Sequence, residues 1–110
     1  MKPTQNLGEF EQLVLLAILR LQQVGAYGVT IRAEIAMHTE RNPAPGAIYT
    51  TLDRLENKGL VKSKVGESTP QRGGRSKRYY HVTAGGLRSL KRAMSEYQIL
   101  AQGLTVLGES

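Results

Sequence analysis

The charged side chains that could do chemistry are concentrated in one stretch of the chain. Residues 58–92 hold ten lysines and arginines against a single acid, Glu67, whereas residues 1–57 hold five basic and six acidic residues. The ten basic residues are Lys58, Lys62, Lys64, Arg72, Arg75, Lys77, Arg78, Arg88, Lys91 and Arg92. Cations gathered in this way bind phosphates, so the net charge of +6 favours a nucleic acid or an anionic membrane surface as partner. The alternative is a solvated face that aids solubility, although acidic residues would serve that purpose equally well.

No catalytic group and no metal-ligand set can be named from the sequence. His38 and His81 are isolated, with no carboxylate at ligand spacing, and the chain has no Cys. There is no Gly-x-Ser-x-Gly elbow, and Gly73-Gly74 does not form part of a P-loop. We therefore expect a protein that is not an enzyme and that uses no cofactor and no metal.

A helix expected over residues 46–58 would place a polar face toward solvent. Ile48, Leu52 and Leu55 fall at i, i+4 and i+7, which predicts a narrow core-facing stripe. The opposite side carries a face of small and polar residues: Thr50, Asp53 and Asn57, flanked by Ala47 and Arg54 on one side and Tyr49 on the other. A helix with this shape fits the major groove of DNA.

We predict that this helix recognises DNA through Tyr49, Thr50, Arg54 and Asn57. An ordinary solvated helix face remains the alternative, most of all for Asp53 and Asn57. Tyr49 could instead be half-buried and support the following hairpin, and Arg54 could pair with acidic neighbours on the surface.

A β-hairpin is expected next, with strands over 61–65 and 77–83. In the second strand Tyr80 and Val82 alternate with Tyr79 and His81, which is the period of a strand. Residues 66–76 between the strands form a loop rich in Gly, Ser and Arg. We predict that this hairpin is a wing that contacts phosphates or the minor groove through Arg72, Arg75, Lys77 and Arg78.

The remaining segments are predicted to be helical. One helix is expected over 8–24, capped by Asn6 and Glu9, and it is so apolar that it must be buried on most sides or shared with a second subunit. A short helix is expected over 28–39. A last helix begins near Ala84 with Thr83 as its cap. It carries a heptad-like seam that predicts dimerisation through Leu87, Leu90, Met94, Tyr97, Ala101 and Leu104.

The predicted fold is mainly α with a small β-hairpin (α+β). Its order of helix, helix, turn, helix, basic hairpin and helix is that of a winged helix-turn-helix followed by a dimerisation helix. We expect one compact unit, in which residues 1–83 form the DNA-binding domain and residues 84–110 form the C-terminal dimerisation helix.

In these elements the sequence resembles the PadR family of bacterial transcriptional regulators. The resemblance covers about residues 7–90. Its matching stretches are Leu7–Glu11 with Val14–Leu19, Tyr27-Gly28, Gly46–Tyr49, Leu52–Val61, and Arg78–Thr83 with Gly86. Thr50 stands where many members have Pro, and Ala84-Gly85 replaces a more usual acidic pair. The short C-terminal part resembles the subgroup with a single C-terminal helix.

The resemblance implies a homodimer that binds double-stranded DNA at a palindromic promoter site, usually as a repressor. It also implies, for some members, release from DNA by a small hydrophobic effector. A cleft between subunits could be lined by Leu15, Leu19, Met94 and Tyr97, or these residues could simply fill the interface. The alternative functions are a winged helix used for protein–protein assembly and nonspecific nucleic-acid binding.

We expect a cytoplasmic protein with no membrane partner. The longest apolar run, Leu13–Leu19, is too short to span a membrane, and residues 1–6 lack the apolar core of a signal peptide. The absence of Cys suits a reducing compartment.

Overall fold

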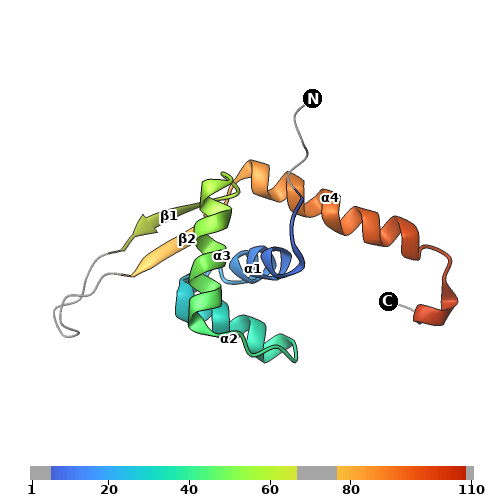
Figure 1. Cartoon of the computed structure of the whole chain (residues 1–110), viewed down its shortest axis with the longest axis horizontal. Helices are drawn as coiled ribbons and strands as arrows, with labels where there is room; N and C mark the ends of the chain where they lie inside the picture. The colour runs from blue at the N-terminus through green and yellow to red at the C-terminus, as the bar shows by residue number, and fades with distance from the viewer. Residues whose placement is uncertain (1–5, 67–76, 109–110) are drawn as a thin grey trace.

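The computed structural model describes residues 6–66 and 77–108. The elements follow one another as α1 (Glu9–Arg20), α2 (Gly28–His38), α3 (Pro45–Asn57), β1 (Val61–Val65), β2 (Arg78–Val82), α4 (Ala84–Ala101) and the 3-10 turn η2 (Thr105–Leu107). The predicted α+β winged helix-turn-helix is therefore confirmed. Figure 1 shows the hairpin and α4 projecting in opposite directions from the packed helices, in a molecule that measures 55 × 37 × 24 Å.

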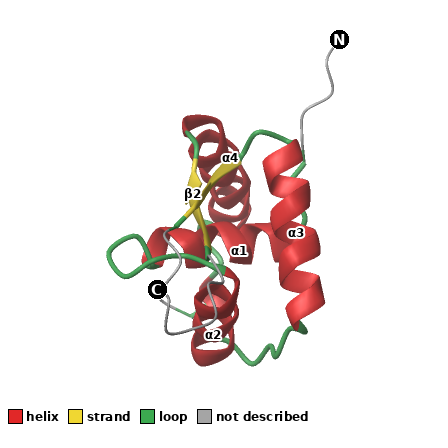
Figure 2. Ribbon diagram, turned by 90° about the vertical axis from the view of Figure 1, so that its left-hand side faces the viewer, coloured by secondary structure: helices red, strands yellow, loops and turns green. Residues whose placement is uncertain are grey.

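Helix α1 occupies the centre of the protomer. Leu15 and Ile18 are wholly buried, and they join Ile31 of α2 and Leu52 and Leu55 of α3 in one core. The views in Figures 1 and 2 show α2, α3, α4 and the hairpin placed around α1. Leu13, Leu16 and Leu19 are partly buried against the same core. The apolar circumference of α1 is thus largely covered within one chain, which is the first of the two predicted alternatives.

Both predicted ends of α1 need correction. The helix stops at Arg20, and Val24 is 74% exposed, so residues 21–24 form a turn that leads into Gly25 at a φ of 109°. At the start the cap is Gly8, whose N–H donates to Glu11 Oε1 at 2.8 Å, and not Asn6 with Glu9. The pairs Asn6 with Glu9 and Gly8 with Glu11 have the same spacing, so the sequence alone could not tell which of them caps the helix. In the structure Glu11 is buried and faces Gly8 N–H.

The hairpin is tied to the helices through its second strand. β1 pairs with β2 in antiparallel register, with Val61 opposite Val82 and Ser63 opposite Tyr80. Tyr80 N–H also donates to Ala26 O at 2.8 Å, so the segment before α2 lies along the free edge of β2. Val61 and Tyr80 are buried on the face that adjoins the core. This fixes the base of the hairpin against α1 and α3.

Helix α4 begins as predicted, but it ends before Leu104, the last residue of the predicted apolar seam. Thr83 Oγ1 accepts from Gly86 N–H at 3.0 Å and caps the helix. Leu90 is buried in the protomer core and not on a free face. The helix stops at Ala101, and Gly103, at a φ of 82°, turns the chain before Leu104. Leu104 therefore does not continue the helical seam. No helix in the described ranges is long and apolar enough to span a bilayer.

Candidate nucleic-acid interface

The outer face of α3 is exposed along its whole length. Ile48, Leu52 and Leu55 are completely buried on the inner side, as the spacing predicts. Thr50 and Asn57 are exposed on the opposite side. Pro45 occupies the first helical turn, where its missing N–H costs no hydrogen bond. The helix is thus held by a narrow apolar stripe and leaves a small polar surface free to meet a partner.

Tyr49 projects from the first half of α3 and is 48% exposed. Its ring and hydroxyl lie directly over Gly28 at the start of α2, so close that a methyl group on Gly28 would collide with the ring. The ring therefore rests on the start of α2, a contact that the predicted alternative of a Tyr supporting the hairpin did not include. Its exposed side remains available beside Thr50.

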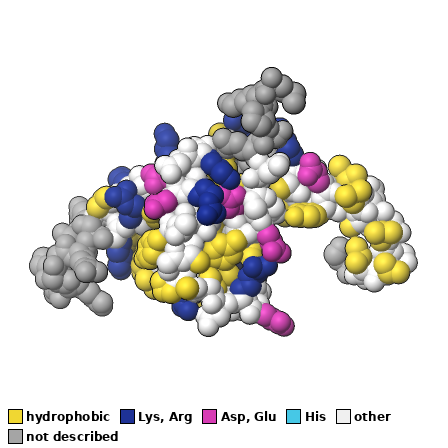
Figure 3. All heavy atoms as spheres, viewed as in Figure 1, with side chains coloured by type: hydrophobic (Ala, Val, Ile, Leu, Met, Phe, Trp, Pro, Cys, Tyr) yellow, Lys and Arg dark blue, Asp and Glu magenta, His cyan; other side chains and the backbone are white. Residues whose placement is uncertain are grey.

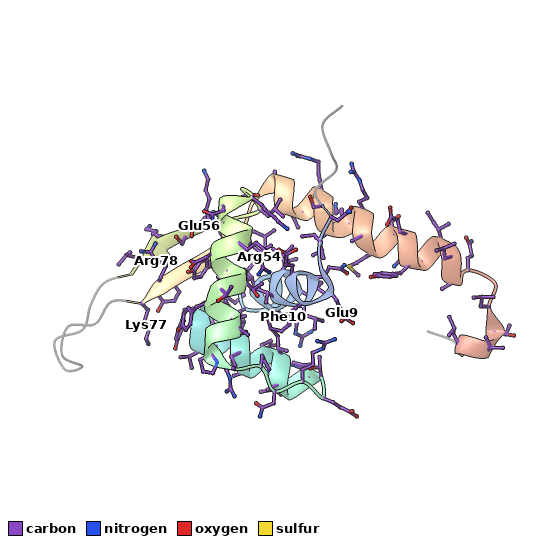
Figure 4. All side chains as sticks on the ribbon, viewed as in Figure 1. Glu9, Phe10, Arg54, Glu56, Lys77 and Arg78 are labelled. Atoms are coloured by element: carbon purple, nitrogen blue, oxygen red, sulfur yellow. The ribbon has the colours of Figure 1, made fainter. Side chains whose placement is uncertain are left out.

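Arg54 forms an ion pair with an acidic residue of α1, and not with the acidic neighbours in α3 that were the alternative for it. Its Nη1 lies 3.8 Å from Oε2 of Glu11, in α1, and its side chain is 52% exposed. In Figure 4 the labelled Arg54 lies on the side of α3 that faces α1, whereas Glu56 lies on the side of the hairpin. Arg54 is therefore at the edge of the exposed face, within reach of both solvent and α1.

The hairpin carries a cation that is linked to α3 by hydrogen bonds. Arg78 Nη1 donates to Ser63 Oγ at 2.9 Å, and the Ser63 hydroxyl donates to Glu56 Oε2 at 2.7 Å. Lys62 and Lys64 are exposed on β1. Figure 3 shows Lys and Arg side chains gathered around the hairpin. Two of the predicted wing residues, Arg72 and Arg75, lie outside the described residues.

Lys77 lies directly before β2, which begins one residue later than the predicted strand, and rests on a pair of tyrosines that the sequence analysis did not connect with it. Its Nζ lies 4.7 Å above the Tyr27 ring, and the Tyr27 and Tyr79 rings meet edge to face at 5.3 Å. Tyr79 fills the space between Gly25 and Gly66, where a side chain on either glycine would collide with it. The sequence signals for this pair were the tyrosines themselves, because aromatic rings bury large areas and favour edge-to-face contacts.

Tyr79 and Tyr80 divide between the two faces of the hairpin, as their alternation predicts. Tyr80 is buried, and this burial, with the nearby Glu56 carboxylate, raises the pKa of its phenol. Tyr80 is therefore neutral at physiological pH and part of the support, whereas Tyr79 is half-buried.

A charged cluster joins the C-terminal end of α1 to the second half of α2. Arg20 Nε donates to Glu34 Oε2 at 2.6 Å, and this hydrogen bond lowers the pKa of the Glu34 carboxyl below its ordinary value. His38 Nε2 lies 3.1 Å from the same oxygen. Within the described residues no group of three or more His, Asp or Glu side chains could hold a metal ion.

The second half of α4 exposes most of its apolar side chains. Of the predicted dimer contacts, Leu87 and Met94 are just over one-third exposed and Tyr97 is 62% exposed. Leu100 is 79% exposed. Figure 3 shows this hydrophobic surface over the end of α4 and the turn that follows. A surface groove of about 400 Å³ lies where Asn6 and Leu7 pass α4, lined also by Arg92 and Tyr97.

The predicted effector cleft needs correction at one residue. Leu15 is wholly buried inside the protomer, so it cannot line a cleft between subunits. Leu19 is only partly buried, and Met94 and Tyr97 are exposed, so these three remain available.

The profile of the transcriptional regulator PadR-like family matches residues 15–92, a span that contains α2, α3, the hairpin, the second half of α1 and the first half of α4. The chain belongs to the PadR-like family. The family is one of transcriptional regulators and not of enzymes, and membership implies regulation through DNA binding.

Solved structures of PadR-like proteins share the fold. A PadR-like transcription factor from Bacteroides fragilis is 23% identical, with a TM-score of 0.70 over 90% of this chain and 89% of that one. A PadR family regulator from Clostridium difficile is 24% identical, with a TM-score of 0.68 over 89% and 97%. One from Eggerthella lenta is 27% identical, with a TM-score of 0.63 over 90% and 86%. No curated protein sequence matches the chain.

Proposed function

We propose that this PadR-like protein is a sequence-specific DNA-binding regulator that reads the major groove with α3 and holds phosphates with its hairpin. The observation that carries the proposal is the joining of two surfaces: the exposed polar face of α3 and the basic hairpin are linked through Glu56, Ser63 and Arg78. A duplex presents base edges beside a dense row of phosphates, so a reader needs both surfaces side by side.

The two surfaces have different tasks in this proposal. Tyr49, Thr50, Arg54 and Asn57 lie along the outer face of α3 and contact the major groove. Lys77 and Arg78, together with Arg72 and Arg75, neutralise phosphates. Arg54 supplies the strongest base contact, because a guanidinium can donate two hydrogen bonds to guanine. The short Thr50 side chain lets the backbone of α3 approach the base edges.

The active form in this proposal is a homodimer that represses from a palindromic promoter site, with residues 1–83 binding DNA and residues 84–110 joining the subunits. Exposed Met94, Tyr97 and Leu100 support this division, because monomers rarely leave a contiguous apolar surface of this kind in water. A two-fold axis through α4 would present two copies of α3 to two half-sites.

Release by a small hydrophobic effector is the remaining part of the proposal. It is supported by the exposed Met94 and Tyr97 and by partly buried Leu19, which a dimer could bring around one cleft. An effector that binds there would change the distance between the two α3 helices and so favour the DNA-free form.

The test begins with selection of duplexes from a random pool by the full-length protein. We expect a palindromic sequence to be enriched and to bind at least a thousandfold more tightly than its scrambled version at physiological salt. Thr50→Ala should cost on the order of 1–3 kcal/mol on the selected duplex and much less on the scrambled one. Repeating the titration with planar hydrophobic compounds tests release.

Two other outcomes would favour the alternative functions. Equal binding of selected, scrambled and RNA duplexes, with a strong salt dependence, would indicate nonspecific nucleic-acid binding. No binding to any nucleic acid would leave a winged helix used for protein–protein assembly.

A further inference from the structure

A buried carboxylate lies directly behind the DNA-facing helix. The side chain of Glu11, in α1, is only 5% exposed, and its main partner lies 47 residues later in the sequence. That partner is Lys58 at the end of α3, whose Nζ donates to Oε1 at 3.0 Å and to Oε2 at 2.9 Å. Gly8 N–H donates to Oε1 as well. The carboxylate therefore has hydrogen-bond partners on both oxygens without Arg54.

Arg54 approaches the same carboxylate without a hydrogen bond. The distance of 3.8 Å from Nη1 to Oε2 is that of an ion pair only, and half of the Arg54 side chain is in solvent. The attraction holds the guanidinium toward α1, but no directional bond must be broken to turn it outward. A loosely held cation of this kind can be recruited by a partner that offers better geometry.

We propose that Glu11 is a positioning residue that keeps Arg54 away from phosphates on the wrong DNA sequence, an inference that rests on the proposed function of α3. A guanine offers Arg54 two aligned acceptors and draws it away from Glu11. A screened phosphate on random DNA offers a weaker contact, so the arginine stays with Glu11. Glu11 thus penalises nonspecific binding rather than strengthening specific binding, which is a recognised source of specificity.

The central variant is Glu11→Gln, which keeps the size and one acceptor oxygen for Gly8 N–H and Lys58 Nζ but removes the charge. Freed from Glu11, Arg54 should reach phosphates on any duplex. We expect affinity for scrambled duplex to rise by about threefold per subunit, with about one more counterion released per subunit, while affinity for the selected duplex changes little. Discrimination should therefore fall about tenfold in a dimer.

The matched control is Glu9→Gln, which removes the same charge from the same helical turn. Glu9 is exposed and pairs with Arg41 at 2.9 Å, away from Arg54. Glu9→Gln should leave the ratio of the affinities for selected and scrambled duplex within twofold of the wild-type ratio. In an Arg54→Gln background, Glu11→Gln should have no further effect on scrambled duplex, because the residue that it releases is missing.

Lys58→Gln provides a second variant that acts in the opposite direction and serves also if Glu11→Gln does not fold. Without Lys58, Glu11 has Arg54 as its remaining cation and should hold it more tightly. Affinity for the selected duplex should then fall severalfold more than affinity for the scrambled one. Thermal melting of each variant gives the folded fraction at the assay temperature.

The outcomes separate this inference from the function on which it rests. If wild-type protein enriches no sequence from a random pool, the proposed function fails. If wild type discriminates but folded Glu11→Gln binds scrambled duplex no better than Glu9→Gln does, the positioning role of Glu11 is wrong. An equal gain for Glu11→Gln with and without Arg54 would also overturn it, because the effect would then be one of net charge.

Discussion

Arg78 is the hairpin cation whose surroundings the structure defines best, since Ser63 fixes its guanidinium and Glu56 orients Ser63. Its long side chain is already partly ordered, so little conformational entropy remains to be lost when it meets a phosphate. Lys77 is ordered in a similar way above the Tyr27 ring. Both residues therefore favour phosphate contacts of defined position rather than a diffuse field.

Arg78→Ala should lower affinity for every duplex by a similar factor. Each lost phosphate contact removes about 0.9 units from the slope of log affinity against log salt, and a dimer loses two contacts. Titrations of selected and scrambled duplexes at several salt concentrations measure the slope. Lys91→Ala, which removes an exposed cation from α4, should leave the slope unchanged. An unaltered slope for Arg78→Ala would exclude it from the phosphate contacts.

At the residue scale, exposure could be predicted from the sequence but partners could not. The spacing of Ile48, Leu52 and Leu55 placed the free face of α3 correctly, because helical periodicity is a local property. The ion pairs of Glu11 join residues that are far apart in the chain, and no local pattern indicates them. No local pattern indicates the contact of Lys77 with the Tyr27 ring either, because these two residues are also far apart in the chain.

At the scale of elements, the turn between the hairpin and α4 depends on a close approach at one glycine. A methyl group at Gly86 would collide with the backbone carbonyl of Leu60 and lie 2.7 Å from Val82 Cγ1. Leu60 O also accepts from Thr83 N–H at 3.0 Å, so it is not free to move away. At neighbouring Gly85 the nearest atoms lie at 3.7 Å, an ordinary contact distance.

Gly86→Ala should therefore destabilise the protein, whereas Gly85→Ala should not. We expect the first substitution to cost on the order of 1–3 kcal/mol, or roughly 5–15 °C in melting temperature. The second should be neutral or should stabilise by up to about 1 kcal/mol, because Ala favours helix over Gly. Thermal unfolding of both variants measures the difference. Equal melting temperatures would mean that α4 can tilt away from Leu60 at little cost.

Element types and order were predictable, and element ends less so. The hairpin strands and the Thr83 cap follow from period-two alternation and from a side chain that accepts from the third residue of the helix. The end of α1 was placed too late because Leu21 and Val24 continue the apolar pattern, although Val24 is exposed. The seam of α4 was extended past Ala101 for the same reason.

At the scale of the whole molecule, the hairpin and α4 have separate roles in the proposed assembly, the hairpin in DNA binding and α4 in dimerisation. The hairpin extends from one side and α4 from the other (Figure 1), so a contact between α4 helices leaves α3 and the hairpin free for DNA. The apolar surface of α4 lies on its second half, beyond buried Leu90, where the helix has passed the core. A single chain leaves this surface uncovered, which is the reason for proposing that two chains meet there.

Tyr97→Glu should break this dimer. Tyr97 is exposed in the middle of the apolar surface, and a carboxylate there would face its own copy across a two-fold axis, at the cost of burying two like charges. Ser95→Glu adds the same charge to an exposed position on another side of α4 and should leave the dimer intact. Sedimentation at micromolar concentration should give dimers for wild type and Ser95→Glu and monomers for Tyr97→Glu.

The Tyr97→Glu monomer should keep its melting transition, because Tyr97 lies outside the core. It should lose most of its affinity for a palindrome, since a monomer on one half-site makes only half of the contacts. A wild-type protein that sediments as a monomer, or a Tyr97→Glu variant that remains dimeric, would require another surface to join the subunits.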